Sequence, residues 1–376
     1  MTEEDPWDDA EFDLAADRLD TPDVIEAADP AAMLRQVASA AAQVRTALRA
    51  AAEADLSQFT PDARPRAIVV AGMGGSGTAG EILGAVCGAG CPVQVLTIRP
   101  ARQSGAGSLP GWVGAADLVI AVSCSGTSAE TLGAATEAAR RGCRLVCVGA
   151  AGSPLHRIAE QSRAPFIRVD QAGEVLPRQT LWALTVPLLV IAERLGIARI
   201  GTDVYEDAAR RLEEVSHQCR PASESFVNPG KSLALDLLGA LPVVWGTSPL
   251  SGVAAGRFAC QLNENAKYPA IHGALPEVVH NQVGVFEGAF AADPPRFPLR
   301  LVLLVDAGTR EHTAISDLAA QRGIAVSELA MGGEHPLVRL AAVVQLTDYA
   351  SVYLGIASGI DPGQADAVRD LPAHIE

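Results

Sequence analysis

The sequence predicts an α/β protein in two halves, each a doubly wound parallel sheet sandwiched by helices. Its 376 residues are enough for two domains. Apolar, β-branched runs alternate with helical segments, which is typical of parallel strands that are buried on both faces. This alternation stops near residue 227 and restarts at residue 242, again with a strand, a turn and a helix. The restart indicates a duplicated domain.

The expected elements of the first half follow in chain order. Residues 1–30 are acidic and contain alanine and proline, so we expect a loose lead-in with one short helix. Residues 31–54 space their apolar side chains as a helix does. Strands are then expected at residues 66–71, 93–98, 117–122, 144–149 and 166–169. Two helices follow, at residues 179–195 and 202–216.

The second half is expected to repeat this design. Strands are predicted at residues 242–247, 299–305 and 324–329, and helices at residues 250–265 and 336–360. We therefore expect an acidic lead-in at residues 1–30, an N-terminal domain at residues 31–220 and a C-terminal domain at residues 221–376.

Composition excludes several classes of partner and cofactor. With 44 acidic and 29 basic side chains the formal net charge is -15, which argues against binding to nucleic acid or an anionic membrane. The longest apolar stretch, residues 181–191, is interrupted by Thr185 and Pro187 and is too short to cross a bilayer. The seven histidines are scattered and no Cys-x-x-Cys pair occurs, so we expect no metal and no other cofactor. The N-terminus lacks the pattern of a signal peptide, so we expect a cytoplasmic protein.

The strongest local motif follows the first predicted strand, where residues 72–80 read GMGGSGTAG. Glycines let a backbone approach a ligand closely, and the helix that follows directs free N–H groups at it. The spacing fits the G-x-G-x-x-G pattern of dinucleotide sites. However, no acid follows the second strand, where residues 97–102 read TIRPAR, and this disfavours a nicotinamide cofactor.

A second loop follows the third predicted strand and carries four hydroxyls: Ser123, Ser125, Thr127 and Ser128. Hydroxyls between a strand end and a helix start provide hydrogen-bond donors for a phosphate, although one of them must cap the helix. Two such loops at the carboxyl ends of strands in one sheet predict a phosphate-binding crevice. Gly75 and Ser76 of the first loop are expected to line it with Ser123, Ser125 and Ser128.

These two loops resemble those of the sugar isomerase (SIS) domain, which binds phosphosugars. Further segments resemble the bifunctional phosphoglucose/phosphomannose isomerase family: LPR at 176–178, NPGK at 228–231, NENAK at 263–267, PEVVHN at 276–281 and DP at 361–362. The resemblance runs from about residue 60 to the end and implies two tandem SIS domains. Residues 1–30 and 284–298 lie outside it.

The resemblance also implies an activity and its residues. It implies isomerisation between an aldose phosphate and a ketose phosphate, which moves a proton between C1 and C2 through a cis-enediol. Glu264 corresponds to the family's base, His280 to the group that opens the sugar ring, and Arg178 to an arginine that stabilises the enediolate. It implies a phosphosugar substrate, no metal, and a homodimer in which His280 serves the neighbouring subunit's site. From the residues alone, a lone Glu on a helix such as Glu264 is usually a solvated surface carboxylate, and a capping or core role stays open for His280.

Two alternatives remain open: a non-catalytic phosphosugar-binding protein, and an SIS isomerase of another phosphosugar. In the family, a threonine and then a lysine follow the Asp–Pro segment. Here Gly363 and Gln364 follow it, no lysine occurs after Lys267, and the nearest cation is Arg369. The absent lysine favours the non-catalytic alternative, whereas Glu264 and His280 favour an enzyme.

Overall fold

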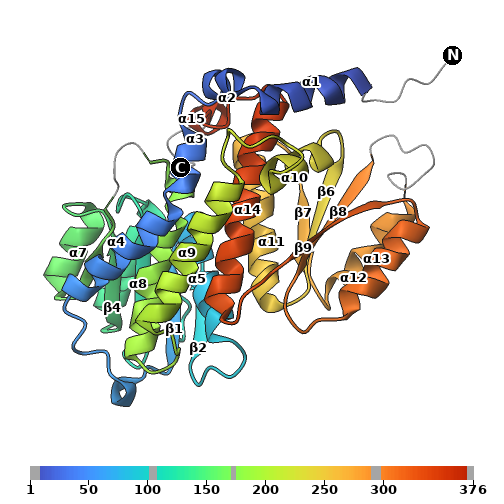
Figure 1. Ribbon diagram of the computed structural model, residues 1–376. Helices are drawn as coiled ribbons and strands as arrows, with labels where there is room; N and C mark the ends of the chain where they lie inside the picture. Colours follow the sequence, from blue (N-terminus) through green and yellow to red (C-terminus); the bar gives the residue numbers. More distant parts are fainter. Residues whose placement is uncertain (1–8, 101–107, 171–174, 289–297, 371–376) are drawn as a thin grey trace. The chain divides into compact units, whose positions relative to one another are not determined.

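The computed structural model describes residues 9–100, 108–170, 175–288 and 298–370 (Figure 1). These residues form two parallel sheets, of five and four strands, with helices on both faces. The chain divides into two compact units. We call Ser39–Arg210 the central unit, and the described parts of Met1–Ala38 and Arg211–Glu376 the terminal unit. The prediction of two doubly wound α/β halves is confirmed.

The sheet of the central unit contains all five strands that the sequence predicts. They are β1 (Ala67–Ala71), β2 (Gln94–Ile98), β3 (Leu118–Ser123), β4 (Arg144–Gly149) and β5 (Phe166–Arg168), each within one residue of its expected bounds. The strand order is β2-β1-β3-β4-β5, and every neighbouring pair is parallel. Every residue of β1 and β3 is buried, as expected for central strands of a sheet that is covered on both faces.

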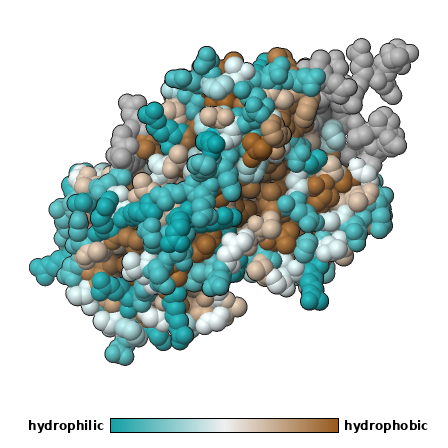
Figure 2. All heavy atoms as spheres, viewed as in Figure 1, coloured by the Kyte–Doolittle hydropathy of each residue, from teal (hydrophilic) through white to brown (hydrophobic). Residues whose placement is uncertain are grey.

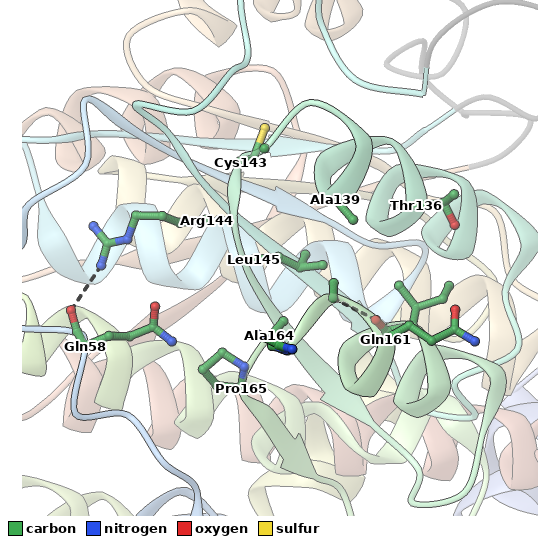
Figure 3. Close-up of a pocket in the computed structure, with 13 residues that line it drawn as sticks. Gln58, Thr136, Ala139, Cys143, Arg144, Leu145, Gln161, Ala164 and Pro165 are labelled. Atoms are coloured by element: carbon green, nitrogen blue, oxygen red, sulfur yellow. Dashed lines mark hydrogen bonds between the residues drawn. The ribbon is translucent and has the colours of Figure 1, made fainter.

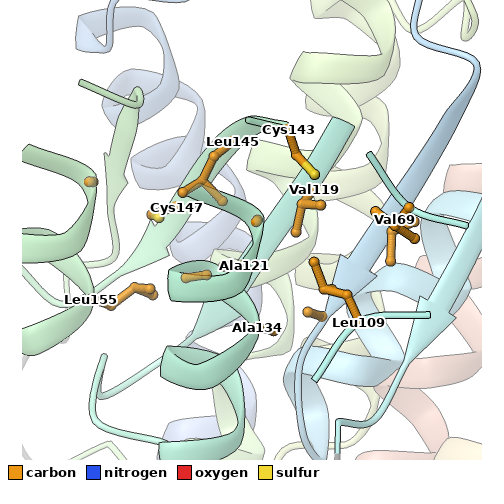
Figure 4. Close-up of a cluster of buried hydrophobic side chains, with 14 residues drawn as sticks. Val69, Leu109, Val119, Ala121, Ala134, Cys143, Leu145, Cys147 and Leu155 are labelled. Atoms are coloured by element: carbon orange, nitrogen blue, oxygen red, sulfur yellow. The ribbon is translucent and has the colours of Figure 1, made fainter. Parts of the chain in front are cut away.

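Helices cover both faces of this sheet. One face packs against α6 (Ala129–Arg140) and α7 (Pro154–Ser162), in a core where Val119 and Ala121 meet Ala134 and Leu155 (Figure 4). The other face packs against α4 (Ala40–Glu53), α5 (Gly75–Cys87) and α8 (Leu181–Arg194). The expected polar helix is α9 (Thr202–Gln218). Hydrophilic side chains predominate over α4 and α9 (Figure 2), where Arg45 forms an ion pair of 2.7 Å with Glu206.

The sheet of the terminal unit has the order β7-β6-β8-β9 and is also parallel throughout. Its strands are β6 (Leu241–Gly246), β7 (Ile271–Ala274), β8 (Leu299–Val305) and β9 (Ala325–Ala330). The sequence predicts β6, β8 and β9 but not β7. That strand is a four-residue edge with Ile271 and His272 exposed, so it lacks the apolar run of a buried strand.

Helices cover this second sheet as well. One face packs against α12 (Val278–Asn281), the turn η4 (Val283–Glu287) and α13 (Glu311–Gln321). On the other face lies α11 (Pro249–Gln261), which packs against α14 (Pro336–Ala357). A short α15 (Asp366–Arg369) follows near the end of the described chain. By length and composition α14 could cross a membrane, but 94% of its most apolar window is buried in the protein, so it is a core helix.

The N-terminal residues are more ordered than the predicted lead-in with one short helix. They form α1 (Asp9–Asp20), α2 (Pro22–Ala28) and α3 (Met33–Ala38). Leu19 and Ile25 are buried, and Arg18 Nη1 donates to the Ala357 carbonyl of α14 at 3.0 Å. These helices are therefore part of the terminal unit.

The single helix expected at residues 31–54 is divided at Ser39 into α3 and α4. The Asp29 carboxylate accepts the N–H groups of Met33 at 2.7 Å and Leu34 at 2.9 Å and so fixes the start of α3. Because α3 belongs to the terminal unit and α4 to the central unit, the chain passes from one unit to the other between residues 38 and 39, and it passes back between residues 210 and 211. The expected domain boundaries lie elsewhere, at residues 30/31 and 220/221.

Candidate functional site

The candidate phosphate site lies at the switch point of the central sheet. The chain leaves β1 for β2 on one side and returns to β3 on the other, so β1 and β3 are neighbours whose following helices diverge to opposite faces. In open α/β sheets, ligands bind in the crevice that this divergence creates beyond the carboxyl ends of the strands. The loops at residues 72–76 and 123–128, here called the first and second loops, flank this point.

The first loop is a tight turn that only glycine allows. A Cβ at Gly72 would lie 2.8 Å from the Ser76 Cβ, and Gly74 has a φ of +50°. Gly75 begins α5, and the next three N–H groups of the helix donate to the Met73 and Gly74 carbonyl oxygens, so the Gly75 N–H is the one at this end that can face a ligand. Ser76 is 7% exposed, and no described residue hydrogen-bonds its hydroxyl. That hydroxyl is available to a ligand.

The second loop contains two hydroxyls with structural roles. Ser123 is buried, and its Oγ accepts the Gly126 N–H at 3.1 Å. Ser128 is the N-cap of α6: its Oγ accepts the Thr131 N–H at 3.5 Å and donates to the Glu130 carboxylate at 2.9 Å. The capping role that the sequence assigns to one of the four hydroxyls belongs to Ser128.

The other two hydroxyls of the second loop are exposed. Ser125 Oγ and Thr127 Oγ1 lie 2.8 Å apart and form a hydrogen bond in which either can donate, and Ser125 Oγ also accepts the Thr127 N–H at 3.3 Å. Their turn requires Gly126, which has a φ of +68° and whose Cβ would lie 2.1 Å from Ser153 Oγ. Because both hydroxyls can rotate toward an incoming acceptor, Ser125 and Thr127 are better placed to donate to a ligand than Ser123 and Ser128.

Arg178 lies in a segment that contacts both loops. It is half-buried in the turn η2 (Pro177–Gln179). A Cβ at Gly75 would lie 3.8 Å from the Pro177 carbonyl oxygen, and Thr180 Oγ1 donates to Cys124 Sγ at 3.2 Å. The structure therefore brings the Arg178 segment to the two loops, as a phosphosugar site in the central unit requires.

Glu264 belongs to the terminal unit and sits on an irregular turn. The sequence predicts an α-helix through residue 265, but α11 ends at Gln261 and continues as a π-helical turn, η3 (Leu262–Ala266). Glu264 is in the middle of this π-turn, with its side chain exposed. Single π-turns often occur at functional sites, because the extra residue displaces a side chain from the regular helical surface.

Side chains on both flanks of Glu264 hold the π-turn in place. Asn263 Nδ2 donates to the carbonyl oxygens of Ala259 at 2.7 Å and Tyr268 at 3.1 Å. Lys267 adopts a left-handed conformation with a φ of +57°, and its Nζ donates to the Glu264 carbonyl oxygen at 2.7 Å. Asn263 therefore links the end of α11 to the segment that follows the π-turn, and Lys267 bonds to a carbonyl group of the turn itself.

The π-turn also rests directly on α14. Asn265 is fully buried, and its Nδ2 donates to Ser351 Oγ at 2.9 Å. One turn further along α14, a Cβ at Gly355 would lie 2.8 Å from the Asn265 carbonyl oxygen. Glycine at this position allows the two backbones to touch. The sequence contains Asn265 within its NENAK segment but gives no sign that Gly355 is its partner.

His280 is exposed on the four-residue helix α12, also in the terminal unit. Gln282 anchors this helix to the sheet: its Oε1 accepts the Trp245 indole N–H at 2.7 Å, and its Nε2 donates to the His272 carbonyl oxygen at 3.1 Å. Since Trp245 is in β6 and His272 in β7, the position of His280 depends on two strands.

The other segments noted in the sequence have structural roles. Asn228 caps α10 (Pro229–Leu237), and the buried Lys231 Nζ donates to the carbonyl oxygens of Pro221 at 2.8 Å and Ser223 at 2.6 Å. Burial lowers the pKa of this lysine. Asp361 Oδ1 accepts the Gly363 N–H at 2.8 Å, within a segment whose Asp361 carbonyl oxygen lies 3.5 Å from Lys267 Nζ. The side chain of Arg369 is outside the described part of the structure.

Within the residues that the structure describes, no group of three or more His, Cys, Asp and Glu side chains could hold a metal ion. A cavity of about 490 Å³ lies elsewhere, at the amino ends of β4 and β5 (Figure 3). It includes Arg144, but that guanidinium donates to the Ala63 and Gln58 carbonyl oxygens. The carboxyl ends of α6 and α7 also face this region, and their carbonyl groups disfavour an anion. Arg163 also lines this cavity, which lies at the opposite ends of the strands from the two hydroxyl loops.

Comparisons with known proteins agree with this arrangement. Residues 226–375 match the family model described as the bacterial phospho-glucose isomerase C-terminal SIS domain. A bifunctional phosphoglucose/phosphomannose isomerase of Caldicellulosiruptor bescii is 28% identical over 82% of this chain and 90% of its own length. A D-glucosamine-6-phosphate 4-epimerase of Sulfolobus acidocaldarius is 28% identical over 57% of this chain and 62% of its own. The fold is shared with a glucose-6-phosphate isomerase-like protein of Thermus thermophilus, with a TM-score of 0.57 and 18% identity over 92% of this chain and 98% of that one.

Proposed function

We propose that the chain, like the bifunctional phosphoglucose/phosphomannose isomerases to which it is 26–28% identical, interconverts glucose 6-phosphate and mannose 6-phosphate with fructose 6-phosphate. The observation that carries the proposal is the pair of hydroxyl loops at the switch point of the central sheet, with the Arg178 segment against both. Hydroxyls that can turn toward a ligand, a helix N–H and a guanidinium match a phosphorylated polyol better than a planar or apolar ligand.

The proposed mechanism divides the work between binding and proton transfer. The Ser76, Ser125 and Thr127 hydroxyls and the Gly75 N–H bind the phosphate, whereas the Ser76 N–H is held by the Met73 carbonyl oxygen. Ser123 and Ser128 shape the loop and are held by Gly126 and Thr131. Because the phosphate is at C6, far from C1 and C2, these contacts stabilise ground state and transition state alike.

The chemical step is assigned to three side chains. His280 moves a proton between the ring oxygen and the anomeric hydroxyl, which opens the sugar ring. Glu264 then removes the proton from C2 of the aldose, the C1 carbonyl oxygen gains a proton, and the cis-enediol forms. Return of the proton to C1 gives the ketose, so no metal or redox cofactor is needed to balance the step. Arg178 stabilises the negative charge that develops on the enediolate oxygens.

The proposal has two further parts that rest on the family. We place the enzyme in the cytoplasm, and we expect it to act as a homodimer in which His280 serves the neighbouring subunit's site. The exposure of His280 on a short helix is compatible with that role, since the side chain extends away from its own sheet.

A direct assay tests the function. The purified protein should convert both aldose phosphates to fructose 6-phosphate, measured with a coupling enzyme specific for the ketose phosphate. In deuterated water, NMR should find deuterium at C2 of the aldose, because a carboxyl proton exchanges with solvent before it returns to carbon. A protein that binds both sugars but catalyses neither conversion nor exchange is the non-catalytic binder, and our proposal would then be wrong.

A second candidate function follows from the similarity to the D-glucosamine-6-phosphate 4-epimerase, which by its name acts on an amino sugar phosphate. An SIS enzyme of another phosphosugar would keep the phosphate loops and differ in its reacting carbon. NMR of the products from glucosamine 6-phosphate separates the two: a change at C4 supports the epimerase, whereas a ketose product supports the isomerase.

Substitution of Ser76 by alanine tests the phosphate loops. The hydroxyl is open to a ligand, and a hydrogen bond to a charged acceptor contributes about 1.5–3 kcal/mol. We expect KM for either aldose phosphate to rise about 10- to 100-fold with a small change in kcat. Ser162→Ala is the matched control, since that hydroxyl donates to the Ile158 carbonyl oxygen within α7. Equal KM values for the two variants would place the phosphate elsewhere.

A further inference from the structure

The terminal sheet has a switch point of its own, and its geometry matches that of the central sheet residue by residue. In the order β7-β6-β8-β9, the chain leaves β6 for β7 on one side and returns to β8 on the other, as it does from β1 to β2 and β3. The last residue of β1, Ala71, pairs with Ala121, and the last residue of β6, Gly246, pairs with Leu304. Two residues beyond each paired position stand Ser123 and Asp306.

Asp306 therefore occupies the position in the terminal unit that Ser123 occupies in the central unit. It is 7% exposed, and its carboxylate has hydrogen-bond donors on both oxygens. Ser248 Oγ donates to Oδ2 at 2.7 Å, whereas Arg339 Nε donates to Oδ1 at 2.8 Å and the Ala307 N–H to the same oxygen at 2.9 Å. A guanidinium, a hydroxyl and a backbone N–H are the donors that bind a phosphate or another oxyanion.

The residues around Asp306 keep these donors in place. Ser248 is the N-cap of α11 and forms a capping box with Ser251. The Asp306 N–H donates to Thr247 Oγ1 at 2.9 Å, and Thr309 Oγ1 donates to the same oxygen at 2.9 Å. Arg339 is fixed by a second bond, from its Nη1 to the Glu334 carbonyl oxygen at 2.8 Å. Loss of the Asp306 carboxylate would leave the hydroxyl and the guanidinium facing one another without an anion.

We propose that the terminal switch point is an oxyanion site that Asp306 occupies with its own carboxylate. The carboxylate accepts the hydrogen bonds of these donors, and its negative charge repels a second anion. The terminal unit therefore binds no phosphate, and the chain binds one phosphosugar, in the central unit. Duplication supplied two anion sites, and the carboxylate at Asp306 closes one of them. Only the statement about one phosphosugar rests on the proposed function.

The proposal is tested by removing the Asp306 carboxylate by substitution and adding a free carboxylate ion, formate, to the solution. Asp306→Ser restores the residue type found at the matching position of the central unit. In a buffer of low anion concentration its thermal midpoint should fall by about 5 °C, since hydrogen bonds to a charged group are lost. Sodium formate should then raise that midpoint with saturation and recover most of the loss, because formate replaces the missing carboxylate. Sodium chloride at equal ionic strength should not.

Two further variants isolate the site. Asp306→Asn fills the same space without the charge, so its midpoint should fall but should not respond to formate. Asp306→Ser combined with Arg339→Gln should lose the formate response, because the guanidinium is gone. If Asp306→Ser cannot be isolated in folded form, its refolding yield in formate and in chloride gives the same readout. A midpoint or yield with no greater response to formate than the wild type or Asp306→Asn overturns the proposal.

The stoichiometry of phosphate binding gives an independent check. Calorimetric titration with inorganic phosphate should find one site per chain in the wild type and a second, weaker site in Asp306→Ser. Two equivalent sites in the wild type would contradict the closed second site. If the wild type binds no phosphate at all, the result contradicts the proposed function and not the proposal about Asp306. The response of Asp306→Ser to formate then remains the test of the proposal about Asp306.

Discussion

Replacement of Glu264 by Gln should lower kcat for both isomerisations together, by about 100- to 10,000-fold. Glucose 6-phosphate and mannose 6-phosphate differ only at C2, and formation of the cis-enediol removes that difference. One base that reaches C2 of both epimers therefore serves both substrates. The amide keeps the size and shape of the side chain. Because Glu264 is exposed, we expect the substitution to leave the stability of the protein unchanged, so the loss of kcat reports the loss of the base. Steady-state assays of each aldose phosphate, with deuterium exchange at C2, measure the loss.

The binding of substrate separates this outcome from a structural defect. KM and the affinity for inorganic phosphate should change little in Glu264→Gln, because the hydroxyl loops belong to the central unit and the substituted residue to the terminal one. Glu26→Gln, at an exposed position of α2 in the terminal unit, is the matched control and should retain full turnover. Full turnover of Glu264→Gln would end the assignment, and loss of only one of the two activities would show that each epimer has its own base.

The phosphate loops could be predicted from the sequence because their conformation depends on residues that are close together along the chain. A buried strand, a glycine turn and a helix start occur within a few residues, and Gly72 and Gly126 have the close approach and the positive φ that such turns require. The alternation of strands and helices then places both loops at the carboxyl edge of one sheet. Which hydroxyls are open was not predictable. Ser123 and Ser128 are the less exposed pair and accept backbone N–H groups, while Ser125 and Thr127 are exposed even though Ser125 Oγ also accepts the Thr127 N–H.

The features that the sequence did not predict all depend on partners far along the chain. The helix predicted at residues 250–265 ends at Gln261 and continues as a π-turn, and the Asn265 backbone of this turn meets α14 at Gly355. Asp306 after a strand would be interpreted as a turn or cap residue, and its role as an anion follows only from the register of β6 and β8. The N-terminal helices are ordered because Leu19 and Ile25 are buried in the terminal unit, whereas local composition suggests a loose segment.

The π-turn itself has two kinds of support, and they can be separated by experiment. Asn263 bonds to carbonyl groups on either side of the turn and Lys267 to one within it, so their removal would also take away hydrogen bonds. Gly355 makes no polar contact through a side chain. It acts only by leaving space, since a Cβ there would lie 2.8 Å from the Asn265 carbonyl oxygen. A change at Gly355 therefore moves the turn that carries Glu264 without altering any charge or hydrogen-bonding side chain.

Gly355→Ala should lower kcat by about 10- to 100-fold and leave KM nearly unchanged. In the interior of a helix, alanine is favoured over glycine by about 0.5–1 kcal/mol, so helix propensity alone predicts a more stable protein. The contact with the Asn265 carbonyl opposes this gain, and overpacking of a well-packed contact costs about 1–3 kcal/mol. We expect the backbone of the π-turn to shift to relieve it, and a displacement of about 1 Å at a reacting group can cost about 100-fold in rate.

Gly256→Ala supplies the control for this prediction. It is the same substitution in α11, the helix that leads into the π-turn, and the nearest atom to its Cβ would be His272 Cε1 at 3.5 Å, an ordinary van der Waals contact. We expect its kcat to stay at the wild-type value and its thermal midpoint to stay level or rise. A folded Gly355→Ala variant with wild-type kcat would show that the base tolerates movement of its turn. A rise in KM without a fall in kcat would mean that the π-turn binds the sugar rather than positions the proton acceptor, because only a displaced base slows the chemical step at saturating substrate.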